Sequence, residues 1–523
     1  MILSFRKLYK MIAITLTIAM PLQALENIAI IGGQSIVITA PAYGALISSP
    51  NTVSPLMFSG DLAEFGNITS VSMSSNGNSL IGGQVQMGSN PAYAALISPT
   101  AEITPLIISG LPGTHGIINS VAINASGQGI IGGRDTTGPI YAALVPTSGN
   151  PLLPLTFSNP IASGGIINTV AINDSGNSLI GGQGFYDLQP AYLGSVTSSG
   201  VMTPLILTGG IATTGTISSV AINSSGNGIV GGQDRTGSYP AYAALISSSG
   251  TVTPLILTGG VATSGTILSV SINSSGNGII GGQDLTGTTP AYTALVTSTG
   301  TVTPIILTGG ISTAGIINSV ATNKAGNSII GGQDLTGSEP AYAALVSSSG
   351  VVTPLSLGSD MEINGTIMTV AIDESGNAII GGQNLMGSQP AFAALVTSTG
   401  SVIPLTFTGD MSIFGWINSV ALPGPASIAI SIEPPTNLQG KQKENSFGIT
   451  YELYNKLTWS PSPSTDVLGF YVYRDGSKIA TLNSSTFSYK DHNRKKGARY
   501  TYSITAFNSS DNESEKITIV LTP

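Results

Sequence analysis

A repeat of about fifty residues, present eight times, constrains the fold of this chain more than any other feature. The string Ser-Val-Ala-Ile-Asn, or a close variant, recurs with a spacing of 50 residues, except for one spacing of 49. Its valines are Val71, Val121, Val170, Val220, Val270, Val320, Val370 and Val420. Self-similarity at a fixed period is typical of repeat architectures, in which each repeat buries its apolar surface against its neighbours.

Two further strings keep the same register. An aromatic residue, usually within Pro-Ala-Tyr, recurs at Tyr43, Tyr93, Tyr141, Tyr192, Tyr242, Tyr292, Tyr342 and Phe392. A Gly-Gly-Gln string recurs with its glutamines at Gln34, Gln84, Gln183, Gln233, Gln283, Gln333 and Gln383, and Arg134 takes this place once. The three strings together define one common repeat.

One repeat is predicted to form four β-strands. In residues 216–260, β-branched and apolar runs cover 217–223, 228–233, 241–247 and 252–257. Turn-forming Gly, Asn, Asp, Ser and Pro separate them every 8–12 residues, as in antiparallel meanders. This density of Gly and Pro excludes helix from the repeats.

The two ends of the repeat region decide how the repeats are arranged. The first repeat begins at Asn27 without a Ser-Val-Ala-Ile strand, and the last copy of that strand, residues 417–422, stands alone. Ring closure requires one orphan strand at each end. We therefore predict an all-β, eight-bladed β-propeller in which the C-terminal strand completes the N-terminal blade. The alternatives are a solenoid, which favours capping repeats, and a membrane barrel, which 6% aromatic residues support poorly.

The N-terminal segment and the absence of cysteine indicate where the protein is located and what can stabilise it. Arg6, Lys7 and Lys10 precede a short apolar run, residues 11–21, and Ala24 follows it, which is the outline of a secretory signal peptide over residues 1–24. The alternative, a retained anchor, needs an apolar run of ~20 residues. The chain contains no cysteine, so no disulfides stabilise it. We expect a secreted or cell-surface protein that has no transmembrane helix after cleavage.

The repeat region is acidic. Residues 27–431 contain three basic residues against fifteen acidic ones, whereas residues 432–523 contain eleven basic and nine acidic residues. An acidic surface repels phosphate backbones, so nucleic-acid binding is excluded.

The repeat resembles the HAF-type extracellular repeat. The matching pieces are Ala221-Ile222-Asn223, Gly226, Gly231, Tyr242-Ala243-Ala244-Leu245 and residues 205–210. Pro-Ala-Tyr replaces the His-Ala-Phe of that family, and the resemblance covers about 400 residues. It implies an exported bacterial protein and says little about the ligand.

The end of the chain differs from the repeats. We predict domains at residues 27–422 (propeller), 423–432 (linker) and 433–523. Residues 433–438, 456–461, 469–476 and 497–508 resemble strands of a fibronectin type III domain. The resemblance implies a β-sandwich, with Trp459 as the core aromatic and Tyr500 as the corner tyrosine that bonds back to the backbone. Such modules serve as spacers or protein contacts.

Candidate chemistry in the sequence is sparse. The only histidines are His115 and His492, so we expect no histidine metal site, no catalytic triad and no cofactor. The glutamines and Arg134 are candidate ligand-binding residues that would contact glycan hydroxyls. The competing interpretation is that they satisfy backbone groups between repeats. Aspartates follow them at Asp135, Asp234, Asp284 and Asp334, either as a second candidate ring or as ordinary turn residues.

The sequence favours a non-enzymatic binding or adhesion protein with glycans or host and cell-surface proteins as partners. The alternative is a secreted carbohydrate-active hydrolase or lyase that uses carboxylates of the propeller channel; no carboxylate pair is singled out for it. A structural surface-layer component is a third reading, and the fold does not decide among them. The oligomeric state stays open.

Overall fold

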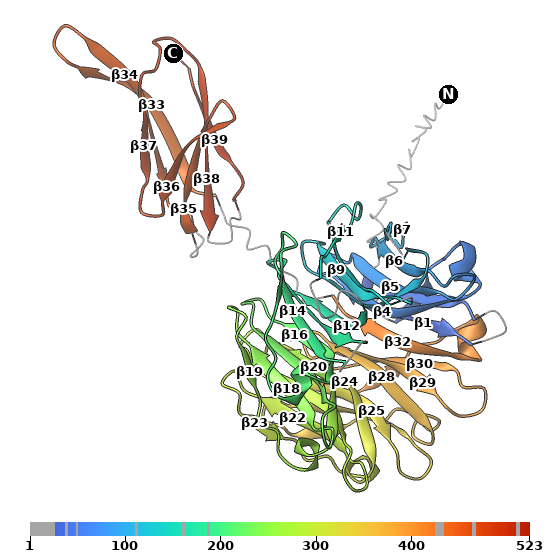
Figure 1. The fold of residues 1–523 in the computed structure, drawn as a ribbon. Helices are drawn as coiled ribbons and strands as arrows, with labels where there is room; N and C mark the ends of the chain where they lie inside the picture. The colour runs from blue at the N-terminus through green and yellow to red at the C-terminus, as the bar shows by residue number, and fades with distance from the viewer. Residues whose placement is uncertain are drawn as a thin grey trace, which may run out of the picture. The chain divides into compact units, whose positions relative to one another are not determined.

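The computed structural model describes residues 27–36, 40–48, 51–109, 113–136, 138–157, 164–185, 189–423, 434–462, 467–508 and 513–522. The predicted signal peptide and most of the predicted linker lie outside these residues. The chain forms two compact units, Met1–Pro425 and Ala426–Pro523. The described residues form ten antiparallel sheets, so the all-β prediction is confirmed (Figure 1).

Eight four-stranded sheets make up the first unit. In seven of these sheets the strands follow one another along the chain from the inner to the outer position, and in the eighth the inner strand is the last strand of the unit. The inner strands are β4 (Gly66–Met73), β8 (Gly116–Ile123), β12 (Gly165–Ile172), β16 (Gly215–Ile222), β20 (Gly265–Ile272), β24 (Gly315–Thr322), β28 (Gly365–Ile372) and β32 (Gly415–Ala421). The second strands are β5 (Ser79–Val85), β9 (Gly129–Asp135), β13 (Ser178–Gly184), β17 (Gly228–Asp234), β21 (Gly278–Asp284), β25 (Ser328–Asp334), β29 (Ala378–Asn384) and β1 (Asn27–Ser35).

The third and fourth strands complete each sheet. The third strands are β6 (Ala92–Ile97), β10 (Ile140–Val145), β14 (Ala191–Val196), β18 (Ala241–Ile246), β22 (Ala291–Val296), β26 (Ala341–Val346), β30 (Ala391–Val396) and β2 (Ala42–Ser48). The fourth strands are β7 (Ile103–Pro105), β11 (Leu153–Pro154), β15 (Met202–Pro204), β19 (Val252–Pro254), β23 (Val302–Pro304), β27 (Val352–Pro354), β31 (Val402–Pro404) and β3 (Thr52–Pro55).

The fourth strands are shorter than the sequence predicts. The run 252–257 was expected to be strand, but β19 ends at Pro254, and all eight fourth strands end at a proline. Proline has no N–H to donate and is tolerated in a sheet on an edge strand. The residue that follows it still donates to the third strand, as the Leu255 N–H does to the Ala243 carbonyl at 2.8 Å. A proline at each outer edge also hinders pairing with another chain.

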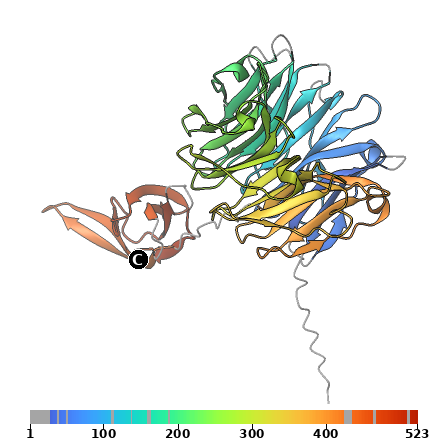
Figure 2. The same cartoon turned by 90° about the horizontal axis from the view of Figure 1, so that it is seen from below.

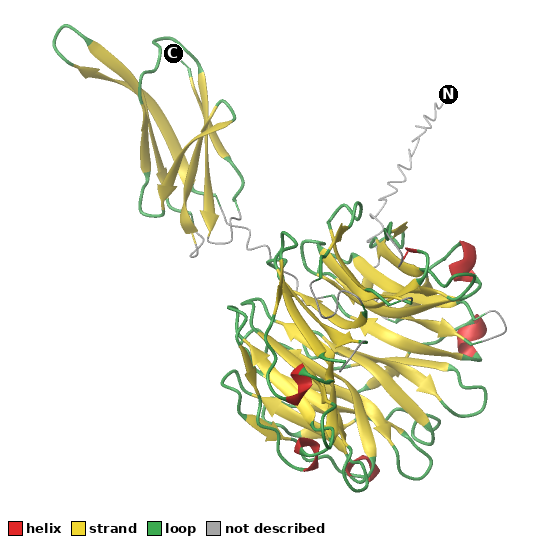
Figure 3. Ribbon diagram, viewed as in Figure 1, coloured by secondary structure: helices red, strands yellow, loops and turns green. Residues whose placement is uncertain are grey.

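The prediction of no helix in the repeats is wrong in detail. Short 3-10 helices occur at η1 (Gly60–Ala63), η3 (Gly210–Ala212), η4 (Gly260–Ala262), η5 (Gly310–Ser312) and η6 (Gly409–Ser412) (Figure 3). Each lies between the fourth strand of one sheet and the inner strand that follows in the chain. None of the described helices has the length and apolarity needed to cross a membrane.

The first and last strands of the first unit share a sheet, as the sequence predicts. Strand β32 pairs with β1, with Val420 opposite Ile31 and Ala421 opposite Ile30. Figure 2 shows the orange end of this unit beside its blue beginning. Each inner strand contacts the inner strand of the next sheet, and β32 contacts both β28 and β4.

A closed set of hydrogen bonds links the eight inner strands. In each one the residue before the repeat valine, Ser or Thr, accepts a hydrogen bond from the valine N–H of the next inner strand, at 3.0–3.2 Å. The hydroxyls belong to Ser70, Ser120, Thr169, Ser219, Ser269, Ser319, Thr369 and Ser419. The last bond joins Ser419 to Val71 and so closes the set across residues 348 positions apart.

The asparagine of Val-Ala-Ile-Asn forms a second, incomplete series. Its side-chain amide donates to the backbone carbonyl of the equivalent residue one repeat later, from Asn124 to Asn173, Asn173 to Asn223, and Asn223 to Asn273. Its Oδ1 accepts from backbone N–H groups of its own turn, as Asn223 does from Ser225 and Asn227. These amides are buried, so the bonds satisfy groups that water does not reach.

Apolar side chains fill the space between neighbouring sheets. One cluster joins Ile229 and Ala243 of one sheet to Val261, Ile267 and Ile280 of the next repeat. An equivalent cluster joins the last sheet to the first, with Ile379 packed together with Ile31 and Ile417. The first unit therefore has a series of apolar cores, each lying between two neighbouring sheets.

The second unit contains two sheets. One has the order β33 (Thr436–Ser446), β34 (Tyr451–Ser460) and β37 (Ser488–Asp491). The other has the order β36 (Ser477–Asn483), β35 (Val467–Arg474), β38 (Tyr500–Asn508) and β39 (Ile517–Leu521). Trp459 is buried between them and packs edge-on against Phe470, with ring centroids 5.8 Å apart.

Candidate functional site

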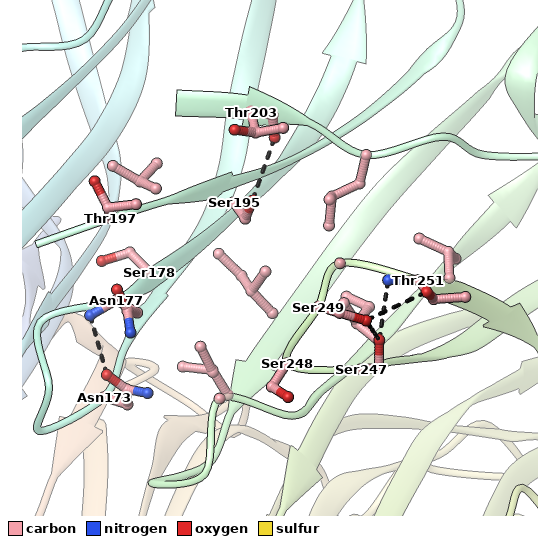
Figure 4. Close-up of a pocket in the computed structure, with 18 of the residues that line it drawn as sticks. Asn173, Asn177, Ser178, Ser195, Thr197, Thr203, Ser247, Ser248, Ser249 and Thr251 are labelled. Atoms are coloured by element: carbon pink, nitrogen blue, oxygen red, sulfur yellow. Dashed lines mark hydrogen bonds between the residues drawn. The ribbon is translucent and has the colours of Figure 1, made fainter. Parts of the chain in front are cut away.

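A groove of about 770 Å³ lies in the first unit between the sheet β12–β15 and the sheet β16–β19 (Figure 4). Its walls come from the turns after the inner strands and from the turns between the third and fourth strands. These turns gather at the same end of the sheets, so the groove opens on that face.

One departure from the repeat explains why the groove occurs at this junction. Strand β14 carries Ser195 where the other seven third strands carry leucine, at Leu46, Leu96, Leu144, Leu245, Leu295, Leu345 and Leu395. At the following junction Leu245 reaches the turn of the next sheet, with its Cδ1 3.9 Å from where a Cβ on Gly300 would lie. No Ser195 atom lies that close to the equivalent Gly250. The shorter side chain leaves the space open.

Hydroxyl and amide side chains make up the polar part of the groove lining. The polar residues labelled in Figure 4 are Asn173, Asn177, Ser178, Ser195, Thr197, Thr203, Ser247, Ser248, Ser249 and Thr251. On one side the hydroxyls of Ser247 and Ser249 are 2.8 Å apart, and the Thr251 N–H donates to Ser247 Oγ at 3.0 Å. On the other side Ser195 Oγ donates to the Thr203 carbonyl at 3.4 Å. The turns are thus fixed by their own hydrogen bonds.

As far as the chain is described, two polar groups of the groove lack the hydrogen bonds that would hold them; the second, Ser178 Oγ, shares this with Ser79 at the same repeat position. In four later repeats the corresponding asparagine Oδ1 accepts from a serine N–H of the outer turn, as Asn227 does from Ser248 at 3.1 Å. Among the described residues no such bond holds the Asn177 side chain. Ser178 Oγ is buried and has no hydrogen-bond partner in the described part of the chain. Unpaired polar groups favour a ligand that pairs with them.

The floor of the groove is apolar and the whole lining is uncharged. Leu179, Val196, Leu205, Ile222 and Ile246 form the floor. The described residues that line the groove include no Asp, Glu, His, Lys or Arg. A site with an apolar floor and a polar part of neutral donors and acceptors suits a neutral, hydroxyl-rich ligand.

The predicted glutamine ring lies at the other end of the second strands from the groove. Three of these glutamines donate from Nε2 to the carbonyl of the first residue in the next inner strand: Gln84 to Gly116, Gln233 to Gly265 and Gln283 to Gly315, at 2.9–3.1 Å. Gln333 and Gln383 donate to carbonyls six residues later in the chain, and Gln183 is half-buried at the same position of β13. These contacts favour the interpretation in which the amides satisfy backbone groups between sheets.

The predicted aspartate ring follows the glutamines. Asp234 Oδ1 accepts from the N–H and the hydroxyl of Thr236 at 2.8 and 2.6 Å, and Asp284 and Asp334 repeat this turn. Asp135 is fully buried at the end of β9. Arg134 places its guanidinium carbon 5.4 Å from the centroid of the Phe185 ring. The structure therefore gives three of the aspartates the role of turn residues, and ligand binding by either ring remains a prediction.

Replacing Gln233 by Ala is expected to lower the free energy of unfolding by ~1–2 kcal/mol, because the Gly265 carbonyl loses its donor in a half-buried place. Chemical denaturation of Gln233→Ala measures the change. The same substitution at the exposed Gln439 is the control and should change the stability by less than ~0.5 kcal/mol. An unchanged stability together with lost ligand binding would instead assign Gln233 to a binding site.

Histidines and metal ligands do not form a centre in the described residues. His115 is exposed, and its Nδ1 lies 3.0 Å from the Thr114 hydroxyl. Within the described ranges no group of three or more His, Cys, Asp or Glu residues is placed to hold a metal ion.

Sequence reasoning missed the groove. The signal was present in Leu193-Gly194-Ser195, which replaces the Ala-Ala-Leu of the third strand in most repeats.

No protein-family model matches the chain, and no curated protein matches it, so the HAF-type resemblance stays a prediction. Among solved structures, puromycin hydrolase is 12% identical over 76% of this chain and 60% of its own length, with a TM-score of 0.45. Sqt1 of Chaetomium thermophilum is 14% identical over 67% of this chain and 86% of its own, with a TM-score of 0.43. An ulvan lyase bound to a glycan is 11% identical over 65% of this chain and 94% of its own length, with a TM-score of 0.40. The chain thus spans about three fifths of the puromycin hydrolase chain, and none of these likenesses bears on what this chain does.

Proposed function

We propose that this chain is an exported, non-enzymatic binding protein that holds a neutral glycan in the groove beside Ser195. The observation that carries the proposal is that one repeat replaces an inter-sheet leucine by serine and opens a groove of about 770 Å³ whose polar lining consists of neutral hydroxyls and amides. Sugar rings present apolar C–H faces and hydroxyls, which match the floor and the polar part of the lining respectively.

The proposed scaffold of the first unit is an eight-bladed β-propeller. Two observations support it: the eight four-stranded sheets, of which the first is completed by the last strand, and the closed series of hydroxyl bonds between inner strands. A rigid ring keeps the two walls of the groove at a fixed separation, which lowers the entropic cost of binding.

The second unit is proposed to be a fibronectin type III-like sandwich. Its sheets contain strands in the orders given above, Trp459 is buried, and the Tyr500 hydroxyl accepts a hydrogen bond from the Lys495 N–H at 3.3 Å. The last contact agrees with the bond to the upstream backbone that the resemblance implies for Tyr500.

Export is proposed from the N-terminal sequence, residues 1–24, which has the outline of a secretory signal peptide. A cell-surface or secreted location would bring the groove into contact with extracellular glycans or with glycans carried by host proteins. The alternative function, a carbohydrate-active hydrolase or lyase, would need carboxylates at the bond that breaks, and none lines the described groove.

Replacing Ser195 by Leu is expected to weaken binding of neutral oligosaccharides at least tenfold, or ~1.4 kcal/mol, because the leucine fills the groove as it does at the other junctions. Binding of the exported chain, residues 25–523, is measured by calorimetry against ligands identified on a glycan panel. The stability should hold or rise, since the substitution restores the repeat. The reciprocal Leu245→Ser variant opens the next junction and leaves the first groove intact.

Full affinity in Ser195→Leu would place the ligand elsewhere. Release of cleaved or unsaturated products from the same glycans would support the hydrolase or lyase, and would direct attention to carboxylates outside the groove.

A further inference from the structure

The hairpin between β33 and β34 ends in an apolar tip. Phe447, Ile449 and Tyr451 have exposed fractions of 65%, 103% and 58%. Ser446 and Tyr451 form the last pair of the ladder, and the Phe447 N–H donates to the Thr450 carbonyl at 2.8 Å, so the tip is an ordered turn. Figure 1 shows this hairpin extending beyond the other strands of the second unit. Three exposed apolar side chains at one tip indicate an interaction surface.

Lysines form a row across the sheet that carries this hairpin. Lys441 lies directly opposite Lys456, and Lys456 lies directly opposite Lys490 on the next strand. Directly opposed residues of antiparallel strands project from the same face, and like charges placed this way are destabilising. Lys443 projects from the same face, opposite Tyr454. Such a row favours an anionic partner that offsets the repulsion.

More positive charge lies beside the tip. The Arg494 N–H donates to the Leu453 carbonyl at 2.8 Å, and Gln442 Nε2 donates to the Lys495 carbonyl, which holds the loop of Arg494, Lys495 and Lys496 against the hairpin. The carboxylates on this hairpin are Glu444, which is exposed, and Glu452, which is paired with His492 at 2.8 Å. On the adjacent strand Asp491 is paired with Arg494 at 3.5 Å, so Lys495 and Lys496 supply the charge of the loop that no described residue pairs. The hairpin region is thus basic in a chain whose formal net charge is -8.

We propose that this hairpin docks the protein on a lipid bilayer with anionic headgroups. The tip enters the boundary between headgroups and acyl chains, where apolar side chains at an interface are buried by 5–10 Å or so. The lysine row and the exposed Lys495 and Lys496 contact the headgroups, to which basic residues near the surface are attracted. An apolar tip alone fits a protein partner equally well; the lysines commit the surface to an anionic membrane. This inference is independent of the glycan groove.

Vesicle co-sedimentation of residues 25–523 tests the proposal, because this chain lacks the N-terminal apolar segment. We expect binding to vesicles of equimolar phosphatidylcholine and phosphatidylglycerol, and at least ~10-fold weaker binding to phosphatidylcholine alone. Phe447→Ser with Ile449→Ser should lower the partition constant by ~100-fold or more. The triple variant Lys441→Ser, Lys456→Ser, Lys490→Ser should lower it ~100-fold and reduce its dependence on salt.

The matched control is Ile306→Ser, which removes another highly exposed isoleucine (85%) from the first unit and should leave binding unchanged. Circular dichroism checks that each variant is folded. No binding to the mixed vesicles would overturn the proposal. So would binding that the lysine variant loses and the tip variant keeps, particularly if a soluble sulfated polysaccharide competes, because that result assigns the lysine row to a free polyanion.

Discussion

Raising the pH from about 10 to about 12 is expected to unfold the first unit. Burial raises the pKa of the seven repeat tyrosines to about 12: Tyr43, Tyr93, Tyr141, Tyr192, Tyr242, Tyr292 and Tyr342. Tyrosine ionises near pH 10 in an unfolded chain. The folded state therefore keeps protons that the unfolded state releases, and the stability, complete below pH ~10, falls as the pH rises through that interval.

The expected slope is steep because the seven contributions add. Each tyrosine contributes ~1.4 kcal/mol per pH unit, so the set contributes up to ~10 kcal/mol per pH unit, which is comparable to the whole stability of a typical domain. Absorbance of tyrosinate and far-ultraviolet circular dichroism should change together in one narrow transition. Tyrosinate that forms gradually near pH 10 in a still-folded protein would contradict the prediction.

A triple variant, Tyr242→Phe, Tyr292→Phe and Tyr342→Phe, is the control for this transition. The hydroxyls of these three residues are buried without hydrogen-bond partners among the described residues, and Phe392 already occupies the equivalent place in another repeat. The variant should shift the alkaline transition to higher pH. At neutral pH its stability should be unchanged or higher, because removing an unpaired buried hydroxyl removes a desolvation cost.

Replacing Gly232 by Ala is expected to lower the free energy of unfolding by at least ~3 kcal/mol. A Cβ at this position would lie well inside van der Waals contact with the carbonyl oxygen of Thr216 in the adjacent inner strand. Next to this contact the ladder between β16 and β17 shifts register, between Ile217 and Ser219. Backbone atoms on both strands would have to move, and denaturant titration measures the cost.

Gly237→Ala is the matched control. Gly237 has a positive φ of 60°, and a Cβ there would meet nothing within 4 Å. The expected cost is only the ~1 kcal/mol of a left-handed backbone for an L-residue. Equal losses of unfolding free energy in the two variants would show that the close approach of the Thr216 carbonyl oxygen is not the reason for glycine at position 232.

The sequence predicts the sheets of the first unit well, for a physical reason. Turn residues such as those of Ser224–Gly226 recur with the period of the repeat. A turn depends only on residues within a few positions of one another, so these residues mark the ends of the strands in the sequence itself. The pairing of the last strand with the first also follows from sequence, since each end of the repeat region carries an incomplete repeat. The burial of Trp459, which the fibronectin type III resemblance implies, is confirmed as well.

The contacts between sheets could not be predicted from the sequence. The serine before Val220 looks like any half-buried strand residue; its partner is in another repeat, so its role as an acceptor depends on how two sheets meet. The groove depends on the same geometry, because Ser195 opens space only if the missing leucine would have reached the neighbouring turn. The glutamines were recognised as a set, but their partners, such as the Gly265 carbonyl, become visible only when the sheets are placed together.

The pairing of β32 with β1 has a consequence for the order in which the molecule forms during synthesis. The strands β1–β3 leave the ribosome first, yet their sheet lacks its inner strand until residue 421 has been made. Seven other sheets are complete before that point. The last strand of the first unit, β32, therefore completes the sheet of the first strand, β1. The pairing joins residues nearly four hundred positions apart, so this step is non-local and slow compared with the formation of the local hairpins. Until then the chain carries an open strand edge at its beginning, and a truncation before β32 would leave that edge exposed for pairing with another chain.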